Sequence, residues 1–171
     1  MIGSVVLAIT LAFELPEPQV MQRPPRDPSA AILSSFLVWR IVFVSLIFAA
    51  GIFGQFKLAI VMGRDLETAR TIAVNTLIAM EVFYLFSIRY GYSTSLSWKG
   101  IMGTRPVLVS LALVTIFQLF FTYVPFMQRI FDTRALGLGN LLLVLGTGLA
   151  LFAIVEIEKQ IRLRFQDMSA E

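Results

Sequence analysis

The sequence contains no cysteine and no histidine among its 171 residues. Without cysteine there is no disulfide and no thiol nucleophile, and without histidine there is no imidazole for proton transfer or metal binding. Charged residues are also few, at 15% of the chain. These absences exclude Cys/His metal sites and thiol or imidazole catalysis within the chain.

Hydrophobic residues are abundant instead. They make up 57% of the chain, and the mean hydropathy of +0.81 is outside the range of an ordinary soluble domain of this length. The net charge of +3 comes from basic residues that lie beside apolar runs rather than in one patch. This pattern predicts an integral membrane protein surrounded by membrane lipid, and it argues against nucleic acid as a partner.

Four apolar runs approach the length of about 20 residues that a bilayer core requires. An opening run, 1–13, would reach only about 20 Å as a helix, too short for a core of about 30 Å. It has no basic segment before it, which argues against a signal peptide. We therefore expect an all-α integral membrane protein, an antiparallel bundle of four full transmembrane helices preceded by a truncated helix. The four predicted spans are Phe36–Phe56, Thr71–Ser87, Pro106–Val124 and Leu136–Val155.

The distribution of Lys and Arg predicts the orientation of the bundle. Nine of these residues lie on the side of the bundle that carries the connection 14–35 and the tail 156–171, and five lie on the opposite side. The positive-inside rule places the first side in the cytoplasm. We therefore expect a Pro-rich cytoplasmic loop at 14–35, four membrane helices within 36–155 and a cytoplasmic tail at 156–171.

Glu81 lies near the middle of the second predicted span, where an ionised carboxylate costs about 2.5 kcal/mol or more. Such a residue faces the bundle interior, pairs or titrates. Two interpretations stay open, a cation ligand or proton carrier and a neutral side chain that hydrogen-bonds another helix. For Asn75, Gln118 and Thr122, hydrogen bonding between helices is favoured. In the tail, Glu158 and Arg162 are spaced i, i+4 and are expected to pair.

The stretch "LAFELPEPQVMQRPPRDP" resembles the loop after the sixth transmembrane helix of cation-transporting P-type ATPases of the calcium-pump-like class. That loop has the recurrent form F-x-P-P-E-x-x-x-M-x-x-P-P-R. The downstream stretches resemble the family's next four helices in sequence order. They are "FLVWRIVF" for the seventh, "ARTIAVNTLIAMEVFYLFSIR" for the eighth, "LVTIFQLFFTYVPFMQRIFDT" for the ninth and "LLLVLGTGLALFAIVEIEKQIRLR" for the tenth.

The resemblance implies that the chain is the C-terminal membrane part, the sixth to tenth helices, of an ATP-driven cation pump. Within "LIAMEVF", Glu81 matches a glutamate that calcium-pump-like members use as an ion ligand, and Ser4 stands where the family has an ion-binding aspartate. Asn75 is a weaker candidate ligand. Because a hydroxyl is neutral, the site would lack one negative charge. A monovalent cation, a proton or a single divalent ion then becomes the expected cargo.

The sequence contains neither the Asp-Lys-Thr-Gly phosphorylation motif nor a phosphate-binding loop of the G-x-x-x-x-G-K type. We therefore expect no catalytic residue, no cofactor and no ATP hydrolysis in this chain alone. ATP and Mg²⁺ are implied for the full-length pump, and the implied partners are the transported cation and the N-terminal pump domains. The expected location is the plasma membrane of a prokaryote. The alternative is a small, self-sufficient helical membrane protein that acts as a partner or assembly subunit.

Overall fold

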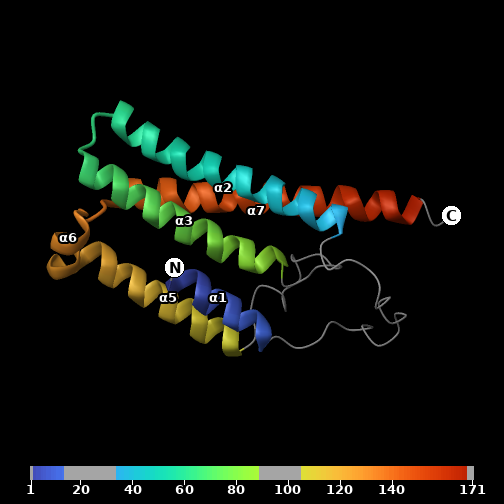
Figure 1. Cartoon of the computed structure of the whole chain (residues 1–171). Helices are drawn as coiled ribbons and strands as arrows, with labels where there is room; N and C mark the ends of the chain where they lie inside the picture. The colour runs from blue at the N-terminus through green and yellow to red at the C-terminus, as the bar shows by residue number, and fades with distance from the viewer. Residues whose placement is uncertain (1, 14–33, 89–104, 169–171) are drawn as a thin grey trace.

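The computed structural model describes residues 2–13, 34–88 and 105–168, which form helices without a strand in those ranges (Figure 1). This arrangement confirms the expected all-α bundle. The predicted Pro-rich loop falls largely at 14–33, outside the described residues. The helices are α1 (Ile2–Ala12), α2 (Ser35–Val61), α3 (Leu66–Ile88), α5 (Arg105–Tyr123), α6 (Pro125–Phe131) and α7 (Leu138–Met168).

Four of these helices are long and apolar enough to cross a membrane, and they correspond to the four predicted spans. Three of the helices are longer than the predicted apolar runs; for example, α3 begins at Leu66 rather than Thr71, and α7 continues past Val155 to Met168. Hydropathy marks the part of a helix that lies in lipid. Charged residues such as Glu, Lys and Arg are good helix formers and extend the helix beyond it.

The connection between α2 and α3 is a tight turn that places the two helices side by side. Gly63 has a φ of +74°, a left-handed conformation that glycine adopts without a steric penalty. Its N–H donates to the carbonyl of Ile60, and the N–H of Arg64 donates to the carbonyl of Ala59, both at 3.0 Å. This pair of bonds is a Schellman motif, which satisfies carbonyls that the end of α2 would leave open.

The short helix α6 was not predicted. The apolar run that ends at Val124 is followed by Pro125, which stands at the first position of α6, where its missing N–H costs nothing. Asp132 ends α6 in a left-handed conformation with φ 47°. The chain therefore makes a compact reversal after α5 and approaches α3 again before α7 begins.

Helix α3 lies between two pairs of neighbours, α2 and α7 on one face and α1 and α5 on the other (Figure 1). A Cβ at Gly51 of α2 would lie 2.8 Å from the end of the Met80 side chain, and a Cβ at Gly148 of α7 would overlap the ring of Phe83. Both glycines therefore permit close approach to α3. At three other glycines at or near the start of α7 or within it, an added Cβ would meet nothing within 4 Å: Gly137, Gly139 and Gly146.

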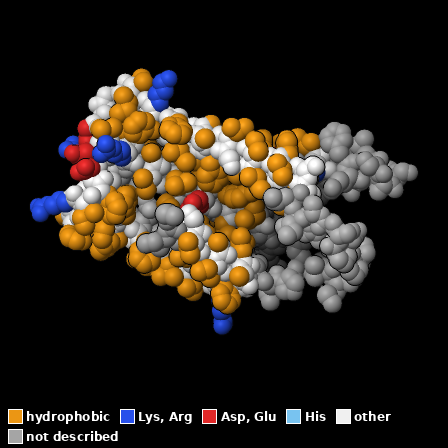
Figure 2. Space-filling view, in the orientation of Figure 1, with side chains coloured by type: hydrophobic (Ala, Val, Ile, Leu, Met, Phe, Trp, Pro, Cys, Tyr) orange, Lys and Arg blue, Asp and Glu red, His pale blue; other side chains and the backbone are white. Residues whose placement is uncertain are grey.

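Large hydrophobic side chains cover much of the outer surface, with exposed fractions of 72% for Phe53 and 74% for Val61. Charged side chains gather at the end that carries the α2–α3 and α6–α7 connections (Figure 2). A hydrophobic surface of this extent is stable only where it faces lipid or further protein. The protein is therefore a multi-pass integral membrane protein.

Candidate functional site

The candidate site is centred on Glu81, in the second half of α3. Its Oε1 accepts a hydrogen bond of 2.6 Å from the hydroxyl of Ser4 on α1. The two residues are 77 positions apart in the sequence, so this contact is made by the packing of α1 against α3. The structure thus brings together two of the three predicted ligands, and their role in binding an ion stays a prediction.

The second carboxylate oxygen of Glu81, Oε2, is buried and has no hydrogen-bond partner among the described residues. Gly3 lies beside it, since a Cβ at Gly3 would be 3.5 Å from Oε2 and 2.9 Å from Cδ1 of Ile78. Leaving a buried polar atom without a partner costs about 1–3 kcal/mol, and more when it is charged. The carboxylate is therefore placed to accept a cation, a proton or a donor that lies outside the described residues.

One groove is lined by this carboxylate, and a second cavity begins at the neighbouring Gly3. A groove of about 190 Å³ is lined by Ser4, Glu81 and Tyr84, together with apolar residues of α1 and α3. A larger cavity of about 630 Å³ begins at Gly3 and extends along α3 and α5 to α6. Its lining is hydrophobic except for Gln118, whose Nε2 is buried without a partner in the described part of the chain. The hydrogen bond to another helix that we predicted for Gln118 is therefore not made by its Nε2 in the described part of the chain.

Asn75, the third predicted ligand, also lies on α3, but its side chain hydrogen-bonds Thr71 and Thr122 rather than Glu81 or Ser4. Its Nδ2 donates to the carbonyl of Thr71 at 2.8 Å and to the hydroxyl of Thr122 on α5 at 3.1 Å. Both Asn75 and Thr122 are buried. Their side chains therefore join α3 to α5, as expected of polar groups between membrane helices.

The oxygen atoms on these residues could form part of a coordination shell. Ser4 offers a neutral hydroxyl, and Glu81 offers one carboxylate. No group of three or more His, Cys, Asp or Glu side chains that could hold a metal occurs in the ranges that the structure describes. Because Ca²⁺ takes six to eight oxygen ligands, the described side chains supply a fraction of such a shell.

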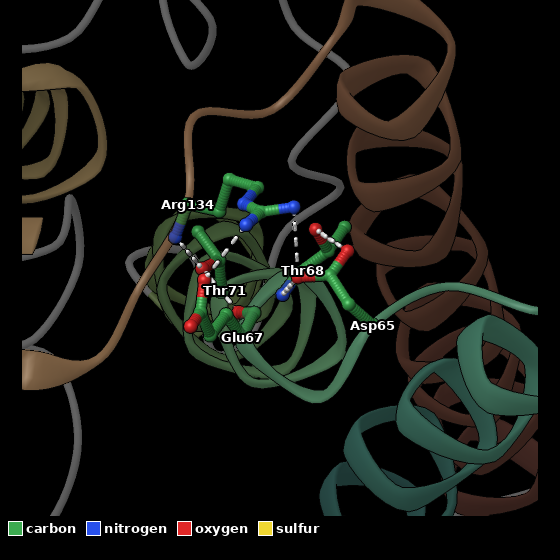
Figure 3. Close-up of polar contacts among 5 residues, drawn as sticks. All are labelled: Asp65, Glu67, Thr68, Thr71 and Arg134. Carbon is green, nitrogen blue, oxygen red and sulfur yellow. Dashed lines mark hydrogen bonds and ion pairs between the residues drawn. The ribbon is translucent and has the colours of Figure 1, made fainter.

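A second polar cluster lies at the end of the bundle and was not predicted (Figure 3). Arg134, from the α6–α7 connection, forms ion pairs with Asp65 at 3.4 Å and Glu67 at 3.3 Å. Its backbone N–H donates to the hydroxyl of Thr71 at 3.0 Å. These contacts join the start of α3 to the start of α7. Sequence reasoning assigned Arg134 to topology and gave no signal of its partners, which are more than 60 residues away.

Asp65 also caps α3. Its Oδ1 accepts a 2.7 Å hydrogen bond from the hydroxyl of Thr68, and its Oδ2 accepts a 3.3 Å bond from the backbone N–H of the same residue. The side-chain bond from Thr68 is the main reason that the pKa of Asp65 lies below its usual value, and Arg134 adds to the effect. Asp65 therefore stays ionised where it supports the helix start.

A third cluster joins the other end of α3 to α7. Lys159 is fully buried, and its Nζ lies 2.8 Å from Oε2 of Glu156, which is also buried. The same Nζ donates to the carbonyl of Ser87 in the last turn of α3, at 3.5 Å. A cation at a helix C-terminus satisfies open carbonyls and interacts favourably with the helix dipole. The predicted pair of Glu158 and Arg162 is also present, at 4.0 Å.

Comparisons with known proteins agree on one family. A family model described as "Cation transporting ATPase, C-terminus" matches residues 1–161. The chain is 33% identical over 156 residues to "Probable cation-transporting ATPase F" of Mycobacterium tuberculosis, covering 91% of this chain and 17% of that protein. It is 35% identical over 139 residues to "Cation-transporting ATPase pma1" of Synechocystis, and these residues cover 78% of this chain and 15% of that protein.

A third relative is "Calcium-transporting ATPase" of Bacillus subtilis, 30% identical over 142 residues that cover 81% of this chain and 16% of that protein. The chain therefore spans about a sixth of the length of these relatives. The family match at 1–161 includes Glu81 and the helices α1, α3 and α5 that surround it.

Proposed function

The chain belongs to the family of cation-transporting ATPase C-termini, and from this premise we propose that it is the membrane-embedded C-terminal part of an ATP-driven cation pump. It contributes oxygen ligands for the ion and anchors the transport helices. The observation that carries this proposal is the buried Oε2 of Glu81, which has no partner among the described residues. A carboxylate held this way inside a membrane bundle is typical of an ion or proton pathway.

The charge of the site bears on the cargo. Ser4 is hydrogen-bonded to Glu81 at 2.6 Å but carries no charge, so the pair contributes one negative charge at most. One carboxylate balances one monovalent cation or one proton, or half the charge of a single divalent ion. Asn75 is turned toward Thr122, so a role as ligand would require its amide to leave that bond.

The complete pump would need parts that this sequence does not contain. Phosphorylation by ATP would take place on N-terminal domains, with Mg²⁺ as the partner of the nucleotide. The chain would then respond to movements that begin in those domains and would hydrolyse no ATP by itself. The distribution of Lys and Arg supports a cytoplasmic C-terminus. The relatives from bacteria support a prokaryotic plasma membrane as the location.

The alternative, an independent small membrane protein, has less support. The residues matched to a large ATPase cover 91% of this chain. The Oε2 of Glu81, without a partner among the described residues, and the cavity beside it also suit a protein whose interior continues into further helices.

The test compares Glu81→Gln with wild type in the complete reading frame. We expect one cation, or acidification, to stimulate ATPase activity in the wild type, and we expect Glu81→Gln to weaken the apparent affinity for it by about tenfold or more. Glu67→Gln is the matched control, because Glu67 lies on the same helix at the end of the bundle. Unchanged stimulation in Glu81→Gln would leave Glu81 a structural residue and remove the proposed site.

A further inference from the structure

A groove on the outside of the bundle lies apart from the Glu81 site. It has a volume of about 500 Å³ and lies between the first turns of α2 and the last turns of α7. One wall is formed by Trp39 and Phe43, whose rings stack with their centroids 5.1 Å apart. The other wall is a stripe of α7 at positions i, i+3, i+4, i+7 and i+8, which is one face of a helix. This stripe consists of Ile154, Ile157, Glu158, Ile161 and Arg162.

The groove faces outward from the bundle, and we expect it to lie at the level of the lipid headgroups. Trp39 is 50% exposed and Ile157 is 59% exposed, so both walls are open to the surroundings of the bundle. The apolar run of α7 gives way to charged residues from Glu156 onward, and Glu158 and Arg162 line this groove. Tryptophan is enriched at this level in membrane proteins. An occupant of the groove would therefore place an apolar portion along the isoleucines and a polar portion beside the charged residues.

The charged residues define the polar portion. Oε2 of Glu158 is buried and has no hydrogen-bond donor among the described residues, while Oε1 lies 4.0 Å from Nε of Arg162. Arg162 makes further contacts and contributes a positive charge to the same wall. A negative group that needs a donor and a positive group therefore stand side by side in the groove. The complementary headgroup carries both a cationic donor and an anion.

We propose that this groove binds a phospholipid with a phosphoethanolamine headgroup, whose ammonium pairs with Glu158 and whose phosphate pairs with Arg162. An ethanolamine ammonium has N–H donors that can pair with the Glu158 carboxylate, which lines the groove. A choline headgroup has the same charge but no N–H donor. A glycerol headgroup supplies an anion but leaves Glu158 without a cation. The three headgroups therefore differ in what they offer this groove.

The test measures lipid retention by native mass spectrometry on the intact polypeptide, titrated in detergent with phosphatidylethanolamine, phosphatidylcholine or phosphatidylglycerol. We expect wild type to bind phosphatidylethanolamine about tenfold more tightly than phosphatidylcholine, the factor of one charge-assisted hydrogen bond. Glu158→Gln removes the charge at constant shape and should reduce the preference severalfold. Because the readout is a ratio within one protein, partial loss of folded material does not change it.

A second variant tests the place of binding. Ile157→Trp fills the groove and should lower the retention of both phosphatidylethanolamine and phosphatidylcholine. Leu142→Trp is the matched control, on the same helix, 62% exposed and outside the groove. Equal binding of the two lipids by wild type, a full preference in Glu158→Gln, or tighter binding of phosphatidylglycerol would overturn the proposal. The assay needs no ion transport, so its result is independent of the pump function proposed above.

Discussion

The face of α3 that packs against α2 and α7 differs from the face toward α1 and α5 in how closely the helices approach. On the first face, Gly51 and Gly148 bring two helix backbones against Met80 and Phe83. A pocket lined by residues of α2, α3 and α7 near the α2–α3 turn measures about 10 Å³, room for one water at most. On the second face, the cavity beside Gly3 measures about 630 Å³.

The closely packed face of α3 holds helices together, and the open face carries the candidate ion-binding side chain. The close face carries the buried pair of Lys159 and Glu156, in which each charge has an opposite charge beside it. The open face carries Glu81, which has a hydroxyl on one oxygen and no described partner on the other. A membrane bundle tolerates an unpaired carboxylate where something else completes its environment. The proposed function therefore assigns the ion, or further helices, to the open face.

The largest expected effect is on the close face. Lys159→Met removes the ammonium 2.8 Å from Glu156 and leaves a buried carboxylate without it. We expect a loss of about 3 kcal/mol in the free energy of unfolding. The double variant Lys159→Met with Glu156→Gln should recover much of the loss. Denaturant unfolding in detergent measures both, and a single variant as stable as wild type would show that this pair does not hold α7 to α3.

Gly148→Ala tests the closeness of the same face by a change of one methyl group. The new Cβ would overlap the ring of Phe83 and lie 3.3 Å from a backbone atom of Ala79, so α3 and α7 must separate. We expect a loss of about 2 kcal/mol in the free energy of unfolding. Gly146→Ala on the same helix meets nothing within 4 Å and should be neutral or slightly stabilising. Equal melting temperatures for the two variants would contradict the close packing.

The open face is tested by Gln118→Leu. The substitution removes a buried Nε2 that has no described partner and adds apolar volume to the cavity. For this chain alone we expect a gain of about 1 kcal/mol in stability. In the intact pump the same substitution should be destabilising, because a partner from another helix would be lost. A thermal melt of each protein shows whether the substitution raises or lowers its stability. Higher stability in both proteins would mean that no polar group from another helix enters the cavity.

The smallest effect concerns pH at the end of the bundle. The folded-state pKa of Asp65 lies below its ordinary value of 3.8 because of the bond from Thr68, so this carboxyl stabilises the fold above pH 3.8. The contribution is lost as the pH falls through the lowered pKa. We expect the stability difference between wild type and Thr68→Val to shrink in that range. Asp65 is exposed, and solvent screening keeps the effect small. A difference that is constant with pH would contradict this account.

Much of the fold could be predicted because lipid imposes a simple length rule on apolar runs. The same rule could not predict where helices end in water, which is why α7 reaches Met168 rather than Val155. Helix α6 was not predicted because no polar linker separates Pro125 from the apolar run before it. Pro at the first position of a helix is nevertheless a recognisable signal.

Part of the candidate site could be predicted from the sequence, and part of it could not. Glu81 could be found from the sequence, because placing a carboxylate inside a membrane span costs free energy and therefore indicates a function. Its contact with Ser4 depends on how α1 lies against α3, which the resemblance suggested and the residues alone could not. Arg134 carries an ordinary surface charge, and only the folded chain shows that it joins two carboxylates at the start of α3.

The cluster around Arg134 has a consequence for the order of synthesis. A ribosome completes the turn between α2 and α3, with Asp65 and Glu67, more than 60 residues before it reaches Arg134. The hairpin of α2 and α3 is therefore synthesised before this partner exists. The ion pairs can form only after α5 and α6 have been made, so they are among the later contacts to join the start of α3 to the α6–α7 connection. Because these ion pairs are exposed, we expect added salt to weaken the closure of this end, and, in a chain without cysteine, no disulfide contributes to it.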